Sequence, residues 1–421
     1  MTVRSRRSRD VALLAFGGML TACASQHAGM TTGAPETSAA CNAPLADSIQ
    51  VVDLPGSPFQ ALPSADGCWV FVSMPSGQQS RTGGIAVLHR ANGRLKLAHV
   101  AHIDASPTGM VLTHDAKTLI VAGGPRIAFL DVARLTSGRN AVAEGYLDEP
   151  NIARIGRIYA NVTRDDRFAF VSDENAQTVT VIDLAKARAS HFDRSSIVGK
   201  IPTGGAPIAV TLSPDESTLY VTSEIAPRNF GWPAACRRES GPAGDNTPVN
   251  PEGVIHVVDV ARAIVDPAHS IVRSVAAGCS AVRLVLSPTG DRAYVTARSS
   301  NALLVFDARK LRDDPSHALL GHVSVGTAPV GVAVIDDGRK VVVTNSNRFA
   351  GGRDDRQYLT VVDATRIDAG DAAIVGSIPA GGFPRELRVT SDGSTLLLTN
   401  FSSSSVEAVD LRRLPLEPPR R

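Results

Sequence analysis

The stretch SPDESTLYVTSE, Ser213–Glu224, has the pattern of a β-hairpin cut from a larger sheet. A polar turn, Pro214–Glu216, precedes a run rich in β-forming residues, and such a run is typical of a strand. Because a hairpin alone is at best marginally stable in water, this one requires neighbouring strands. We therefore expect further copies of the pattern elsewhere in the chain.

The pattern occurs seven times in one register. The second residue of each run, here called the phased residue, is apolar or aromatic in every copy: Phe71, Ile120, Phe170, Tyr220, Tyr294, Val342 and Leu397. The position thirteen residues earlier, here called the corner residue, is most often proline: Pro58, Pro107, Arg157, Pro207, Ala281, Pro329 and Pro384. Eight residues after the corner, six copies have an acid and the fifth has threonine: Asp66, Asp115, Asp165, Asp215, Thr289, Asp337 and Asp392. This regularity indicates an internal repeat.

Each repeat contains two more strands. The third strand ends in Asp in six units and in His instead in the first: His89, Asp131, Asp183, Asp259, Asp307, Asp363 and Asp410. A fourth strand then leads to the next corner, as in IVGKIPTGGAP, Ile197–Pro207. Four short strands, A to D, thus fill about 50 residues. We expect the aspartates of the A–B turns and of the C-strand ends to be structural, because this side chain caps turns and accepts backbone N–H bonds.

Seven units of four strands predict an all-β fold, a seven-bladed β-propeller with four antiparallel strands per blade. A twisted sheet with two apolar faces cannot cover both, whereas sheets packed around an axis cover each other. The elements YVTS (Tyr220–Ser223), VVTN (Val342–Asn345) and VIDL (Val181–Leu184) resemble those of the YVTN-repeat β-propeller family. The resemblance extends over about residues 49 to 414 and implies the fold more than an activity.

Ring closure sets the expected domain boundaries. The seventh unit ends after Val406–Leu411 without a strand D, and Ser48–Pro55 has the place of one. We predict that this N-terminal strand completes the last blade, which removes a sheet edge. The expected organisation is residues 1–22 as a lipoprotein signal peptide, 23–47 as a flexible tether, 48–414 as the propeller and 415–421 as a C-terminal tail.

The N-terminus has the features of an export signal. Arginines at positions 4, 6, 7 and 9 precede a short apolar run, Val11–Leu20, and then Leu20–Cys23, which resembles the bacterial lipobox. We expect Cys23 to carry lipid and to hold the protein in the cell envelope, at the outer membrane on its periplasmic or surface face. The alternative is an ordinary secretory signal cleaved near Ala24. A net charge of +2 argues against nucleic acid as a partner.

Four cysteines remain besides Cys23, and an even number in an exported protein suggests disulfides. Three pairings are possible. We favour Cys41–Cys68 and Cys236–Cys279, because each joins near neighbours in the chain. A metal site is the rival interpretation, but the sequence contains neither a Cys-x-x-Cys motif nor a histidine pair near the cysteines, so we expect no metal.

The B–C connections are longest in units one, four and six, and in a propeller they open on the same face as the D–A corners. Insertions concentrate where a surface is free to vary and to bind. We therefore place ligand-binding candidates at this mouth: Arg157, Tyr159, Arg228, Phe230, Trp232, Arg283, Arg348, Phe349, Arg385 and Glu386. Arg283, Arg348 and Arg385 would form a cationic lip with Glu386 as counter-charge. For each single residue, structural packing is the alternative.

Three functions are compatible with this pattern. The first is a monomeric, lipid-anchored module without a cofactor that binds an envelope protein, peptide or glycan. The second follows from the resemblance, since some similar propellers open sugar lactones; Glu386 or Glu224 would then be the base, and Arg283 or Arg385 the electrophile. The third is a redox partner subunit. The sequence contains no Gly-x-Ser-x-Gly motif, and no histidine falls in a B–C loop, which favours the binding module.

Overall fold

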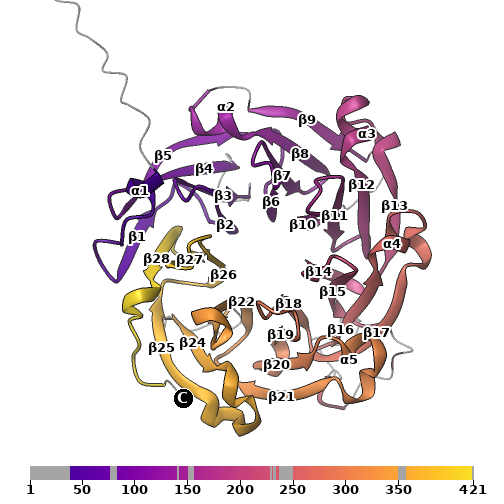
Figure 1. Ribbon diagram of the computed structural model, residues 1–421, viewed down its shortest axis with the longest axis vertical. Coiled ribbons are helices and arrows are strands. Elements are labelled where there is room, and N and C mark those ends of the chain that lie inside the picture. Colours follow the sequence, from indigo (N-terminus) through magenta and orange to yellow (C-terminus); the bar gives the residue numbers. More distant parts are fainter. Residues whose placement is uncertain are drawn as a thin grey trace, which may run out of the picture. The chain divides into compact units, whose positions relative to one another are not determined.

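Seven four-stranded antiparallel sheets, all within the described residues, form a ring around a central axis (Figure 1). The computed structural model describes residues 38–75, 83–139, 142–149, 156–227, 230, 234–236, 250–348 and 357–419. The chain runs around the ring once, from indigo to yellow in the figure, and the A strands line the channel. The predicted all-β, seven-bladed propeller is therefore confirmed.

The strands of each blade follow one another in the chain. Blades 1 to 3 contain β2 (Gln60–Pro63), β3 (Trp69–Met74), β4 (Gly84–Ala91) and β5 (Arg94–His102); β6 (Met110–Leu112), β7 (Thr118–Gly123), β8 (Arg126–Asp131) and β9 (Ala143–Asp148); β10 (Arg157–Val162), β11 (Phe168–Asp173), β12 (Thr178–Asp183) and β13 (Ile197–Pro202). Blades 4 and 5 contain β14 (Gly205–Leu212), β15 (Thr218–Ile225), β16 (Glu252–Asp259) and β17 (Ile271–Cys279); β18 (Ala281–Leu286), β19 (Arg292–Ala297), β20 (Ala302–Asp307) and β21 (Leu319–Ser324). Blade 6 contains β22 (Pro329–Ile335), β23 (Lys340–Asn345), β24 (Gln357–Asp363) and β25 (Ile374–Ala380), and blade 7 contains β26 (Pro384–Val389), β27 (Thr395–Asn400) and β28 (Ser405–Asp410).

The burial pattern explains why the middle strands are almost wholly apolar. Strand β7, TLIVAG, is buried at all six positions, because both faces of a blade pack against neighbouring blades. The outermost strands differ: β21, LLGHVS, is buried at one position only and faces solvent along its length. One hydrophobic cluster lies between each pair of adjacent blades, so the core of the described ring is a set of inter-blade layers.

The A–B turns use their aspartates as predicted, with two variations. In the opening hairpin, Asp215 Oδ1 accepts hydrogen bonds from Ser213 Oγ at 2.5 Å and from the Ser217 N–H at 3.1 Å. In the fifth unit, where threonine replaces the acid, Asp291 accepts from Ser287 Oγ instead. In the sixth unit the turn is a 3-10 helix, η7 (Asp336–Gly338), in which Asp336 pairs with Lys340.

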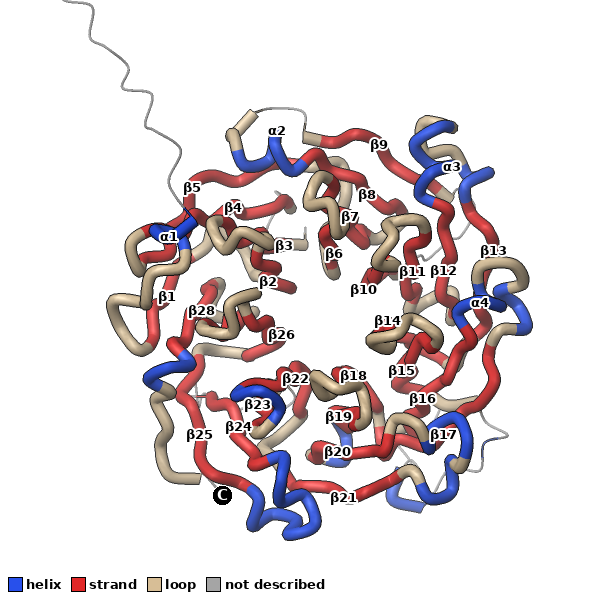
Figure 2. Tube along the Cα trace, viewed as in Figure 1, coloured by secondary structure: helices blue, strands red, loops and turns tan. Residues whose placement is uncertain are grey.

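The aspartates at the C-strand ends cap the short helices at the outer rim of the ring, which are blue in Figure 2. Asp131, for example, accepts from the Arg134 N–H at 2.9 Å. The helices of the C–D connections are α2 (Val132–Thr136), α3 (Leu184–Ala189), η1 (Arg194–Ser196), α4 (Val260–Ala263), η4 (Pro267–His269), α5 (Lys310–Asp313), η6 (Pro315–His317) and η8 (Ala364–Ala373). The remaining short helices are α1 (Ser38–Cys41), η3 (Ala234–Cys236), η5 (Arg298–Ser300) and η9 (Leu411–Arg413). In the described residues, no helix is long and apolar enough to span a membrane.

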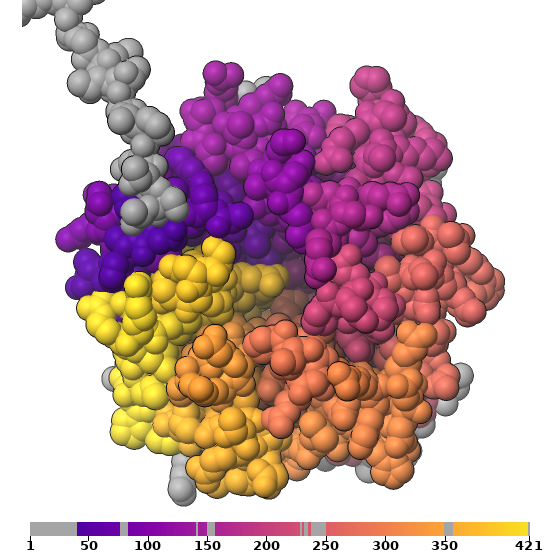
Figure 3. Space-filling view, in the orientation of Figure 1, coloured from indigo at the N-terminus to yellow at the C-terminus, as the bar shows by residue number. Residues whose placement is uncertain are grey.

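The N-terminal strand closes the ring, as predicted. Strand β1 (Ile49–Asp53) pairs antiparallel with β28, from Ile49 opposite Val409 to Asp53 opposite Ser405. The space-filling view shows the indigo and yellow ends of the described chain packed against each other (Figure 3). The C-terminal segment lies along the outer strand of blade 6, because Ser377 of β25 and Glu417 exchange backbone hydrogen bonds at 3.0 and 2.8 Å.

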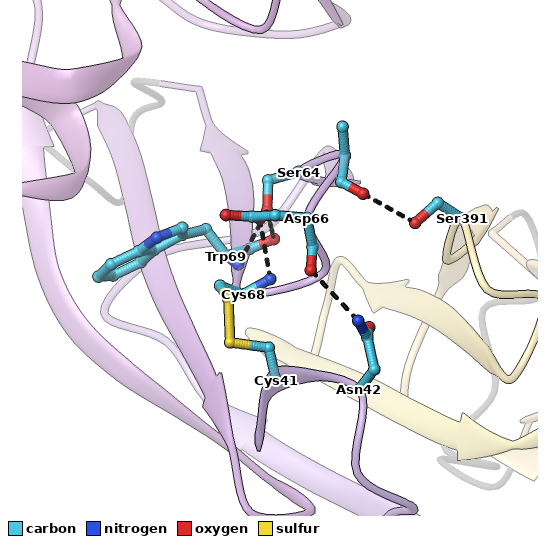
Figure 4. The surroundings of a disulfide bond; sticks show 8 residues. Cys41, Asn42, Ser64, Asp66, Cys68, Trp69 and Ser391 are labelled. Carbon is cyan, nitrogen blue, oxygen red and sulfur yellow. Dashed lines mark hydrogen bonds between the residues drawn. A yellow bond between two sulfur atoms is a disulfide. The ribbon is translucent and has the colours of Figure 1, made fainter. Parts of the chain in front are cut away.

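Both predicted disulfides form. Cys41, at the end of α1, bonds to Cys68 in the A–B turn of blade 1 (Figure 4). Helix α1 directly precedes β1, the strand that joins blade 7, so the bridge ties the start of this closing strand to blade 1. In the same turn, Asp66 accepts from the Cys68 N–H at 3.0 Å, and Ser391 of blade 7 donates to the Ala65 carbonyl at 3.1 Å. Cys236 bonds to Cys279 and links the long B–C connection of blade 4 to the next D–A corner. The first bridge therefore stabilises the region where the ring closes. The second stabilises the end of the ring that carries the B–C connections.

Candidate functional site

A polar cavity of about 150 Å³ lies at the end of the channel where B–C connections and D–A corners meet. We call it the mouth cavity. It is lined by four arginines, two glutamates and four aliphatic residues: Arg283, Arg298, Arg348, Arg385, Glu174, Glu224, Ile158, Ile208, Val282 and Val330. These residues come from blades 3 to 7, so the cavity lies against one arc of the ring.

The repeat register explains which residues reach this cavity. The position directly after the corner residue supplies its floor: Ile158, Ile208, Val282, Val330 and Arg385. The fourth position after the phased residue supplies its wall: Glu174, Glu224 and Arg298. Arg348 follows β23 in the B–C connection of blade 6. Corners and B–C connections therefore share one end of the described channel, as the sequence predicts.

A buried ion pair forms the layer beneath the cavity. Arg283 Nη2 lies 2.6 Å from Glu386 Oε2, and the two side chains are 7% and 5% exposed. The Arg283 guanidinium lies 3.5 Å from the centre of the Tyr159 ring, and the Tyr159 hydroxyl donates to Glu386 at 3.3 Å. A second cavity of about 210 Å³ is also lined by Arg283, together with Tyr159 and Arg388. Arg283 therefore borders both cavities.

Aromatic rings hold the second arginine of the floor. The Arg385 guanidinium lies 3.8 Å from the centre of the Phe59 ring and within 5.7 Å of Phe383 and Phe401. The Arg348 guanidinium lies 5.4 Å from Phe383 as well. A cation over a ring face is attracted to it, more so where water is excluded. Burial lowers the pKa of Arg385 to about 10, so this side chain remains charged at neutral pH.

The three carboxylates of the region differ in their partners. Glu224 forms a two-pronged pair with Arg298, whose Nη1 donates to Glu224 Oε1 at 2.7 Å. Glu386 pairs with Arg283, whereas Glu174 forms no ion pair with another residue in the described ranges. Burial and the nearby Glu224 charge raise the pKa of Glu174 to about 7, against the opposing effect of the surrounding arginines. Of these three carboxylates, Glu174 is therefore the one whose pKa is raised towards neutral pH.

Several polar atoms around the cavity have unused hydrogen-bonding capacity. The Arg283 Nη1 and Arg385 Nε atoms are buried and have no hydrogen-bond partner. Buried polar atoms of this kind are uncommon and costly, so each requires an explanation such as a ligand. Arginine donors suit planar carboxylates and phosphates. Within the described residues, no group of three or more His, Cys, Asp or Glu side chains is arranged to hold a metal ion.

The structure brings only some of the predicted site residues together. Arg283, Arg348 and Arg385 line the mouth cavity, and Tyr159 and Glu386 lie in the layer beneath it. Arg157 is elsewhere: its side chain is fully buried and pairs with Glu149, which also pairs with Lys200. Phe230 lies outside the lining of the mouth cavity. Four predicted positions fall outside the described residues: Cys23, Arg228, Trp232 and Phe349.

Sequence reasoning missed Glu174 and Arg298. Both occupy the fourth position after a phased residue, the place that Glu224 occupies in unit four. The signal was present in the repeat register, because a residue just beyond the end of strand B in each unit faces the same mouth. The length of the B–C connections points instead to units one, four and six, whereas the B–C connections of units three and five, which carry Glu174 and Arg298, are short.

Comparison with known proteins identifies the fold and nothing finer. No family model matches the chain, and no curated protein is similar to it in sequence. Among solved structures, the protein is similar to hydrazine synthase from Kuenenia stuttgartiensis, with a TM-score of 0.60 and 15% sequence identity. The match covers 85% of this chain and 96% of that one. At this identity the similarity supports the propeller architecture alone, because one fold serves many functions.

Proposed function

We propose that this protein is an exported binding module that captures an envelope protein, peptide or glycan at the face carrying the mouth cavity. The observation that supports this most is the cavity itself, a space of about 150 Å³ lined by four arginines, two of which, Arg283 and Arg385, each have a buried donor without a hydrogen-bond partner. Ligand sites are concave and contain a small number of oriented polar groups. A rigid ring of seven blades keeps such groups in position without a ligand.

The proposed location is the cell envelope, through a lipid on Cys23. The two disulfides support an oxidising compartment, since such bonds persist mainly in exported proteins. Membership of the YVTN-repeat propellers is part of the same proposal and is supported by the repeated sequence elements. A Cys23→Ser variant is expected to move from the membrane fraction to the soluble fraction after cell breakage. An unchanged membrane association would argue against the anchor.

The binding face can be tested with two matched arginine variants. Arg348 lines the mouth cavity, whereas Arg339 lies at the opposite end of blade 6, near its A–B turn, with a side chain that is 72% exposed. Each is changed to alanine in the immobilised full-length protein, and partners are captured from envelope extract. We expect Arg348→Ala to lose partners that the wild type and Arg339→Ala retain. Partners lost from Arg339→Ala but kept by Arg348→Ala would place binding on the other face.

A sugar-lactone hydrolase is the second candidate, and the ionisation of Glu174 favours it. A carboxylate with a pKa near 7 can remove a proton from water at neutral pH. Water would attack the lactone carbonyl, Arg385 would stabilise the oxyanion, and the ring oxygen would leave with the proton returned from Glu174. Glu224 and Glu386 suit this role less, since each is held by an arginine.

The hydrolase proposal requires turnover of an aldono-lactone panel, assayed with and without Ca²⁺. Under that proposal, Glu174→Gln abolishes the reaction, because the amide cannot accept the proton from water. Absence of turnover in the wild type across the panel would leave the binding module alone.

A further inference from the structure

We propose that the mouth cavity binds a single small carboxylate group and that Glu174 takes up a proton as the anion enters. This deepens the proposed binding function and rests on it. The ligand class follows from the charges of the cavity, its unused donors and its size. The proton uptake follows from the position of Glu174 among the same cations.

The charge of the region favours one anion. Four arginines line the cavity, with two glutamates beside them and Glu386 directly beneath. Glu386 also pairs with a fifth arginine, Arg388, whose Nη2 lies 3.6 Å from Glu386 Oε1. With Arg388 included, the sum is +2 when Glu174 is ionised and +3 when it is protonated. An anion is therefore favoured in both states, and a cation is opposed in both.

The donors of the cavity suit a carboxylate. Arg283 Nη1 and Arg385 Nε are buried without a hydrogen-bond partner, and their side chains cannot reorient freely. Arg283 is fixed by Glu386 and Tyr159, and Arg385 by the ring of Phe59. Donors fixed before binding reduce the ordering cost of association. Hydrogen bonds from a guanidinium N–H to a carboxylate oxygen are charge-assisted and strong, and a carboxylate has two oxygens for these two donors, which makes this group the preferred ligand.

The size of the cavity limits the ligand to a small group. A volume of about 150 Å³ accepts a carboxylate with a few further atoms. The floor residues Ile158, Ile208, Val282 and Val330 are aliphatic, so the carbon next to the carboxylate meets an apolar surface. A free organic acid and the carboxyl end of a peptide share this chemistry.

Glu174 and the incoming carboxylate compete for the same positive charges. The groups that act on Glu174 come from four other blades: Glu224 from β15, Arg298 after β19, Arg348 after β23 and Arg385 from β26. On its own blade, the neighbouring Asp173 accepts hydrogen bonds from backbone N–H groups, including that of Gly156 at 3.0 Å. An anion bound among these arginines cancels part of the field that keeps Glu174 ionised. Like charges disfavour each other, so binding raises the affinity of Glu174 for a proton.

The test measures affinity against pH by titration calorimetry of the full-length protein. The probes are D-gluconate, a tripeptide with a free carboxyl end, and the same tripeptide amidated. If only protonated Glu174 permits tight binding, the dissociation constant rises about ninety-fold between pH 6 and pH 9. Buffers of different ionisation enthalpy report the proton uptake, which we expect to be about half a proton at pH 7.

Glu174→Gln separates this mechanism from a general effect of pH. This variant mimics the protonated acid, so its affinity should be independent of pH and equal to that of the wild type at pH 6. Glu144→Gln, which changes an exposed carboxylate on β9, is the matched control and should behave as the wild type. Circular dichroism of each variant checks the fold.

The outcomes are distinguishable from those that test the proposed function. Binding of gluconate or of the free tripeptide, but not of the amidated tripeptide, with the expected pH dependence supports the inference. Which of the two binds shows whether the natural ligand is a free organic acid or the carboxyl end of a peptide. Binding without pH dependence, or pH dependence that persists in Glu174→Gln, overturns it and leaves the binding module intact. Failure of every carboxylate to bind, while partner capture still depends on Arg348, overturns it as well.

Discussion

Breaking the buried pair of Arg283 and Glu386 tests whether it stabilises the ring. We consider Glu386→Leu, Arg283→Met and the double variant. In each single variant one charge remains in a layer where the two side chains are 7% and 5% exposed. Removing one partner of a buried pair costs about 3–5 kcal/mol, because the other charge is left uncompensated. The Tyr159 hydroxyl loses its acceptor in Glu386→Leu, which adds about 1 kcal/mol.

The double variant should be more stable than either single variant. Two apolar side chains of similar volume leave no buried charge, and such replacements are often neutral or stabilising. We expect the double variant to lie within about 2 kcal/mol of the wild type. The difference from additivity would measure the coupling between the two residues.

The measurement is chemical denaturation of the full-length protein, followed by both fluorescence and circular dichroism. Asp148→Asn is the matched control, since Asp148 pairs with Arg126 at 2.9 Å but is 53% exposed. An exposed pair contributes about 1 kcal/mol or less, so this variant should change stability little. The reasoning would be refuted by single variants as stable as this control, or by a double variant whose losses simply add.

Three further predictions follow from other parts of the ring. Burial lowers the pKa of His256 to about 4. Between pH 6.5 and pH 4 the unfolded chain therefore binds a proton at this histidine that the folded chain does not, and the free energy of unfolding should fall by up to about 3 kcal/mol over this range. Urea titrations of the wild type and His256→Gln would check this, and equal slopes against pH would contradict it. Replacing Cys41 and Cys68 by serine opens a bridge between residues 27 apart and should cost about 3–4 kcal/mol by chain entropy, measured by the denaturation midpoint. Val52→Asp places a charge at a buried position of β1 and should expose the edge of β28, detected as self-association in light scattering; a monomer as stable as the wild type would contradict it.

The architecture could be predicted because the repeat is encoded in positions that packing constrains. The phased residues are buried in every unit, and the turn aspartates make local hydrogen bonds that recur along the sequence. The closing strand was predictable for the same reason, since the seventh unit lacked one strand and Ser48–Pro55 had its pattern. The disulfides followed from proximity in sequence combined with the placement of turns.

The site was predicted less well, because side-chain partners across the ring are not local in sequence. Arg157 has the sequence position of a mouth residue, yet Glu149 and the Pro125 carbonyl hold it away from the cavity. Glu386 was predicted as a counter-charge and does pair with Arg283, which lies 103 residues away. No pattern in the sequence gives the burial and neighbouring charges that shift the pKa of Glu174.

A comparison among the seven units themselves indicates why the chemistry gathers at the mouth. The phased positions are all large and apolar or aromatic, because both faces of a blade are packed. The position four residues later carries no such constraint, and six residue types occur among the seven units there: Pro75, Gly124, Glu174, Glu224, Arg298, Ser346 and Phe401. The three charged ones stand in consecutive units and line the mouth cavity together with the arginines of units six and seven. Packing alone does not select charges in neighbouring units around one small cavity, and their grouping is what the binding role proposed above would require.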